Sequence, residues 1–215
     1  FKAEIKNLLT DKRKIIISGE SFDFKNPPFK SNNKQIKNYK IDFSISNMLY
    51  GKNNFGYTQF QAELFGKEIL FLSGFLEKNK VIHTNFSFKK NTEKIKDEIE
   101  VKFDDFGLFL KTLGVTDDFL KGKGTLKLKL KKNTQSVLSG NYDINNFSIK
   151  NASFLARILQ LASFTGLLEI LGNDGIPFQK LSGNFHKKNN LISIANTKFE
   201  GISLGATVNG ELNTE

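Results

Sequence analysis

Apolar and polar residues alternate with a period of two through most of this 215-residue chain. Successive side chains of a β-strand point to opposite faces, so the pattern predicts strands with one apolar and one solvated face. Such strands are typical of antiparallel sheets. The sequence therefore predicts a mainly β fold, built as a meander of antiparallel strands whose apolar sides share one face.

A short motif recurs along the predicted strands: an apolar residue, then Ser or Asn, then Gly. It occurs at residues 17–19, 72–74, 138–140, 181–183 and 208–210. The spacing is irregular, which favours a series of hairpins over a solenoid with one repeat length. Glycine within a strand marks bulges and bends, so we expect the sheet to be curved around its apolar face, like a taco shell.

Residues 151–174 carry the one long helical pattern, and apolar residues cover most of its circumference. A helix near 152–171 needs apolar surroundings, which a sheet face, a membrane interface or a bilayer could provide. Arg157, Gln160, Gly166 and Glu169 weigh against a bilayer span. We therefore expect the helix to pack on the apolar face of the sheet, with a position in a membrane interface as the alternative.

Two shorter helices are predicted between strands. Asp104 and Asp105 can cap a helix that ends at Gly114, with Phe106, Phe109, Leu110 and Leu113 on one side. Thr116, Asp117 and Asp118 can cap a further turn that stops at Gly122. Both would add to the cover of the apolar face.

The net charge of +10 raises the question of nucleic-acid binding, but the basic residues argue against it. Of the 32 Lys and Arg residues, only Arg13 and Arg157 are arginines, and the lysines are scattered along the chain. Arginine is the residue best suited to paired contacts with phosphate and guanine. Solvated lysines on strand faces explain the charge best, attraction to an anionic lipid surface comes next, and nucleic acid last.

Residues that could support catalysis are sparse. There is no cysteine, and the two histidines, His83 and His186, lie in strand patterns away from clustered carboxylates. Helix capping explains the adjacent aspartates better than acid–base chemistry does. We expect a protein that is not an enzyme and that holds neither a cofactor nor a metal.

The chain begins with Phe1 rather than Met, so we expect a piece of a longer protein, with any membrane anchor or targeting signal outside it. We divide it into a sheet segment at 1–102 and a second segment at 103–215, which we expect to continue the first.

The second segment resembles a known family through several blocks in a fixed order. The blocks are 105–114, 122–124, 142–147, 151–159, 162–167, 175–178 and 201–207, the last leading to Gly210. In order and spacing this half of the chain resembles the AsmA-like C-terminal region of bacterial envelope proteins of the AsmA, TamB and YhdP type. Residues 1–100 fit that family only through their alternating strands.

The resemblance implies a Gram-negative envelope protein that is anchored in the inner membrane and faces the periplasm. It also implies a long curved sheet whose apolar groove shields acyl chains while phospholipid moves between the inner and outer membranes. Our candidate groove residues come from the apolar sides of the predicted strands and helix. They are Ile41, Phe43, Phe60, Leu64, Phe86, Phe88, Leu126, Leu128, Leu130, Leu155, Ile158, Leu159, Leu204 and Val208.

Phospholipid is therefore the expected ligand, with a membrane surface and other envelope proteins as further partners and no nucleic acid. The alternative function is a scaffold for outer-membrane biogenesis that binds envelope proteins by adding their strands to an open sheet edge. A scaffold would have a closed core and no lipid, whereas a lipid carrier would have an open apolar groove.

Overall fold

A computed structural model describes residues 2–7, 12–24, 38–66, 68–90, 96–131, 137–150, 175–202 and 205–213. These residues are mainly β, and most neighbouring strands pair antiparallel in an open sheet, which confirms this part of the predicted fold class. The chain divides into two compact units, Phe1–Ile99 and Glu100–Glu215. The sequence had placed the division between residues 102 and 103.

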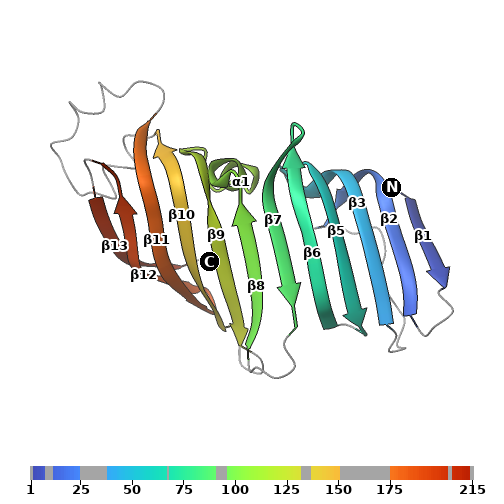
Figure 1. The fold of residues 1–215 in the computed structure, drawn as a ribbon. Coiled ribbons are helices and arrows are strands. Elements are labelled where there is room, and N and C mark those ends of the chain that lie inside the picture. The colour runs from blue at the N-terminus through green and yellow to red at the C-terminus, as the bar shows by residue number, and fades with distance from the viewer. Residues whose placement is uncertain are drawn as a thin grey trace. The chain divides into compact units, whose positions relative to one another are not determined.

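The first unit is a sheet whose strand order follows the chain, β1-β2-β3-β5-β6-β7 (Figure 1). Its strands are β1 (Lys2–Asn7), β2 (Lys12–Asp23), β3 (Asn38–Tyr50), β4 (Asn53–Asn54), β5 (Tyr57–Phe65), β6 (Glu68–Lys78) and β7 (Val81–Lys89), and β4 pairs with the end of β3. Phe43, Ile45, Ile17 and Phe22 form its buried apolar core.

One strand pair departs from the predicted antiparallel meander. β2 and β3 run parallel, with Ile15 beside Ile41 and Ile17 beside Phe43. Parallel neighbours need a connection of roughly a dozen residues or more, and residues 24–37 separate these two strands. Periodicity records which face a side chain occupies but not the direction of a strand, so the sequence pattern could not reveal this pair.

The second unit contains the strands β9 (Phe119–Lys131), β10 (Val137–Ile149), β11 (Ile176–Lys188), β12 (Leu191–Glu200) and β13 (Gly205–Asn213). They follow β8 (Lys96–Phe103), and the boundary between the two units lies within β8. The strands of the second unit lie in the sheet in the order in which they occur in the chain (Figure 1). All pairs from β9 to β13 are antiparallel. Among the described strands β13 pairs only with β12, so its other side is an open edge.

The described residues contain one helix, α1 (Phe106–Thr112), which packs on β9. Asp105 is its N-cap, as predicted, because a carboxylate oxygen of Asp105 accepts a 2.8 Å hydrogen bond from the amide of Leu108. Gly114, with φ of 71°, ends the turn that follows. The predicted helix near 152–171 lies outside the described residues.

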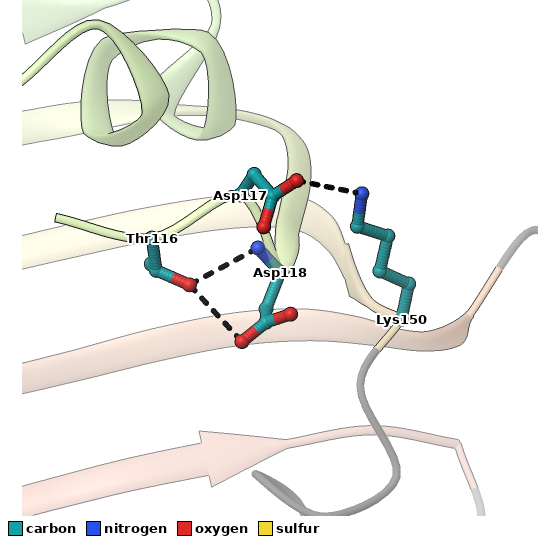
Figure 2. A network of polar contacts seen from close by, with 4 residues as sticks. All are labelled: Thr116, Asp117, Asp118 and Lys150. Carbon is teal, nitrogen blue, oxygen red and sulfur yellow. Dashed lines mark hydrogen bonds and ion pairs between the residues drawn. The ribbon is translucent and has the colours of Figure 1, made fainter. Parts of the chain in front are cut away.

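The second short helix predicted from Thr116 to Gly122 is wrong, because β9 already begins at Phe119. The Thr116 hydroxyl accepts a 3.1 Å hydrogen bond from the amide of Asp118, which closes a tight turn rather than a helix (Figure 2). The Lys150 amide donates to the carbonyl of Asp118, and its ammonium lies 3.5 Å from a carboxylate oxygen of Asp117. These contacts hold the start of β9 beside the end of β10.

The close approach of α1 to the sheet depends on Gly107. A Cβ atom at Gly107 would clash with the carbonyl oxygen of Phe119 and lie 2.8 Å from its carbonyl carbon. Only glycine therefore lets the helix backbone lie directly on the backbone of β9.

Replacing Gly107 with alanine is expected to lower the free energy of unfolding by about 2 kcal/mol, which is the upper end of the overpacking cost less the gain in helix propensity. Alanine favours a helix over glycine by about 1 kcal/mol, but overpacking against a backbone atom costs about 1–3 kcal/mol, and the backbone cannot rotate away. Urea denaturation measures the difference. Gly210→Ala is the matched control, because a Cβ at Gly210 in β13 meets no atom within 4 Å. A Gly107→Ala variant as stable as this control would contradict the packing described.

Candidate functional site

A row of phenylalanine rings crosses four neighbouring strands in the core of the second unit. Phe119, Phe147, Phe178 and Phe199 come from β9, β10, β11 and β12 in turn. The rings of Phe119 and Phe147 stack with centroids 5.6 Å apart, those of Phe147 and Phe178 stack at 5.3 Å, and Phe199 meets Phe178 edge to face at 5.7 Å. With Ile144, Ile149, Ile176 and Leu181 this row forms the unit's buried core.

Left-handed backbone residues keep these apolar side chains on one face. In β10, Tyr142 and Ile144 share the core with Phe147 and Ile149, although strict alternation would put the two pairs on opposite faces. The φ of 57° at Asn146 interrupts the alternation between them. The neighbouring strand β9 has the same interruption at Lys121 and Gly122, with φ values of 60° and 99°. Both strands therefore switch parity at the same level, and their apolar residues stay together.

A third interruption acts in β12. The pairing register of β12 with β13 shifts between Ile194 and Thr197, and Asn196 between them has a φ of 53°. This bulge brings Ile194, Thr197 and Phe199 to the same apolar face. Uninterrupted alternation along β12 does not predict this placement.

This face holds an open apolar cavity of about 450 Å³ between α1 and the sheet. The lining residues come from β8, α1 and the strands of the second unit. They are Phe103, Phe106, Phe109, Leu110, Leu126, Tyr142, Leu181, Ile194, Thr197, Phe199 and Val208. The volume falls within the range of about 300–1,000 Å³ typical of small-molecule sites. An opening lined by so many carbon atoms is suited to a chain-like apolar ligand.

Among the described lining residues, two carry polar side-chain groups, and both groups are hydroxyls. The Tyr142 and Thr197 hydroxyls hydrogen-bond to each other, from residues on β10 and β12. Gly183 on β11 makes room between them, since a Cβ there would lie 2.5 Å from the Tyr142 oxygen and 2.7 Å from the Thr197 oxygen. Burial raises the pKa of the Tyr142 phenol above its ordinary value, and the hydrogen bond with Thr197 acts in the opposite direction. The phenol is therefore protonated at neutral pH.

The apolar face continues along the strands beyond the cavity. Leu126 lines the cavity, Leu128 lies opposite Gly140, and Leu130 lies opposite Leu138 and is 37% exposed. On the next strand, the ring of Phe185 packs over Gly140. Together these side chains form a partly exposed apolar surface next to the cavity.

The predicted groove residues of the first unit also share one face. In the pairing register Ile41 lies opposite Ala62, Phe43 opposite Phe60, and Leu64 opposite Tyr39. Phe86 lies opposite Gly74, and Phe88 lies opposite Leu72. On the other side of β6, Gly74 and Leu72 lie opposite Phe60 and Ala62, so all these residues share one face. Phe43 is buried, and its ring stacks on that of Phe60 at 4.4 Å.

The structure therefore brings the described candidates together in two groups, one in each unit. Of the candidates, Leu126 and Val208 line the cavity, and Leu128 and Leu130 extend from it. Leu155, Ile158, Leu159 and Leu204 lie outside the described residues. Phe106, Phe109 and Leu110 were predicted on one side of a helix but not in the groove, although their position just before β9 was a usable signal.

Two further observations concern the described residues. No three His, Asp or Glu side chains come together there in a group that could hold a metal ion. No helix in the described part of the chain has the length and hydropathy that crossing a bilayer requires.

Comparison with known proteins gave no match to a family model, to a curated protein or to a solved structure.

Proposed function

We propose that this chain shields the acyl chains of phospholipid and thereby contributes to lipid transport between the inner and outer membranes of a bacterial envelope. The observation that carries the proposal is the open, almost wholly apolar cavity of the second unit. The resemblance to AsmA-like envelope proteins supports the choice of ligand. Within this proposal the chain works in the periplasm, is tethered to the inner membrane by a segment outside residues 1–215, and catalyses no reaction.

The physical case is the cost of exposing acyl chains to water. A two-chain lipid carries on the order of thirty methylene groups, and each costs about 0.8 kcal/mol to expose. Transfer of a free lipid through water therefore costs too much free energy to be effective. A carrier lowers this cost by replacing water with apolar contacts. The cavity provides such contacts from Leu126, Val208 and the rings of α1, while its open side leaves a head group in water.

The curved groove predicted from the sequence belongs to this proposal. Within each unit, the apolar sides of neighbouring strands line up in register, which is the arrangement a groove floor needs. In the second unit the cavity opens on that floor, and the surface around Leu128 and Leu130 is where a chain longer than the cavity would continue.

A fluorescent acyl probe tests the proposal in solution. Its emission should rise to saturation with the 215-residue chain, and phospholipid vesicles should displace it, because probe and phospholipid compete for one apolar site. Lysozyme, as a basic protein of different fold, controls for adsorption of the probe to lysine-rich surfaces. Absence of saturable binding would refute the lipid-shielding function.

The scaffold alternative rests on the open edge of β13. Its backbone groups on the side away from β12 are available to another strand in the described structure. Strand addition does not involve the cavity, and it would be lost when proline replaces a β13 residue whose amide points away from β12, since proline cannot donate to a ladder. A partner that binds equally well with the cavity filled by lipid would favour this alternative as an independent role.

A further inference from the structure

The hydroxyl pair in the cavity has one hydrogen more than it uses. Tyr142 and Thr197 each carry one O–H group, and a bond between the two oxygens consumes only one of the two hydrogens. Within the described residues neither hydroxyl makes another hydrogen bond. Whichever residue is the donor, the other keeps an O–H that can donate.

The surroundings of the pair direct that spare donor to the cavity. Thr197 is 5% exposed, and the Asn196 bulge turns it to the apolar face. Apart from these two residues, the part of the lining that the structure describes is made of Phe, Leu, Ile and Val side chains. A donor that faces apolar side chains without an acceptor costs free energy, so a ligand that brings an acceptor to this point gains relative to one that does not.

We propose that the Tyr142–Thr197 pair is a polar anchor that donates a hydrogen bond to a neutral carbonyl oxygen of the bound amphiphile, so that the cavity selects ester-linked acyl chains. This inference rests on the proposed lipid-shielding function and deepens it by naming the chemical class of the ligand. The acyl chain lies against the phenylalanine rings, and its ester carbonyl meets the pair.

Charge explains why the acceptor is neutral. The described residues that line the cavity include neither lysine nor arginine, so a carboxylate held among them would be an unpaired anion in apolar surroundings. The raised pKa of Tyr142 keeps the phenol a donor at and above neutral pH. An ester supplies a carbonyl oxygen without a charge, whereas a free fatty acid at pH 8 brings a charged carboxylate.

The test compares competitors that differ only in the acceptor. A saturated fatty acid methyl ester, the n-alkane of equal chain length and the free fatty acid at pH 8 each displace the fluorescent acyl probe from the 215-residue chain. The expected order of affinity is ester first, with an advantage over the alkane on the order of threefold to tenfold, as one net hydrogen bond provides. In the double variant Tyr142→Phe, Thr197→Val the ester should lose that advantage while the alkane binds as before.

Two further variants keep the result interpretable. Thr197→Ser retains a hydroxyl and should retain the ester preference, which separates hydrogen bonding from packing. Tyr57→Phe removes a tyrosine hydroxyl that hydrogen-bonds to Ser44 and Gln59 in the first unit, and it should leave the ester preference unchanged. Circular dichroism of each variant checks that it is folded.

Each outcome decides a separate point. Binding of the ester and the alkane with equal affinity by the unmodified chain, or an ester preference that survives in the double variant, overturns the anchor and leaves lipid shielding intact. Failure of every competitor and of phospholipid to displace the probe refutes lipid shielding and the anchor with it.

Discussion

Replacing Val208 with tryptophan is expected to abolish most acyl binding. Val208 lines the cavity from β13, and an indole at this position occupies space that the ligand would use. If it displaces about four methylene groups at about 0.8 kcal/mol each, the affinity falls on the order of a hundredfold, since each 1.4 kcal/mol is about tenfold. Titration of the fluorescent acyl probe measures the loss. Aromatic residues are favoured in strands, so the sheet is expected to remain folded.

The neighbouring residue supplies the control. Thr207 is exposed and faces the opposite side of β13, opposite Lys198 in the pairing register. Thr207→Trp adds the same side chain to the same strand but leaves the cavity open, so its affinity should match that of the unmodified chain. Equal affinities for the two tryptophan variants would show that acyl chains bind elsewhere or adsorb without a site.

The second large effect is on stability, at the centre of the phenylalanine row. Phe147 is 2% exposed and its ring lies between those of Phe119 and Phe178. Truncation of a buried phenylalanine to alanine costs about 3–5 kcal/mol, because apolar burial is lost and a void remains. Phe147→Ala should therefore shift the urea midpoint of the second unit strongly downward.

Ile202→Ala is the reference for this measurement, since Ile202 is 82% exposed and its truncation should change stability by no more than about 0.5 kcal/mol. If Phe147→Ala were as mild as Ile202→Ala, the row of rings would not be the core of the unit.

The first turn of α1 gives a smaller effect. Asp105→Ala removes the acceptor of the Leu108 amide hydrogen bond, and loss of such a cap costs about 1 kcal/mol. Asp104→Asn, at the adjacent position, should cost less because Asp105 still caps the helix. Urea denaturation of both variants would contradict the capping assignment if Asp104 proved the more important residue.

Period-two alternation was sufficient to predict the fold class, because burial of one face of an open antiparallel sheet leaves that signature directly in the sequence. It was sufficient also to place Phe43, Phe60, Leu126 and Val208 on the apolar face of their strands, because each lies in an uninterrupted run of alternating residues. The cap at Asp105 was predictable for a similar reason, since aspartate just before a run with helical spacing has a local cause.

The remaining features depend on contacts that a local pattern does not record. Thr197 and Phe199 reach the cavity only because Asn196 adopts a left-handed conformation, and the sequence gives no period from which that bulge could be inferred. Asn146 and Gly122 interrupt the alternation of β10 and β9 at the same level of the sheet. This coincidence depends on the pairing register of the two strands. The hydroxyl pair joins residues 55 positions apart, so its existence follows from the pairing of β10, β11 and β12.

Native mass spectrometry of the purified 215-residue chain, followed by extraction of the bound material, tests the central claim most directly. The account predicts a mass that exceeds the chain mass by that of one or more phospholipids, and release of ester-linked lipid on extraction. An unliganded mass that stays unchanged after incubation with phospholipid vesicles would contradict it.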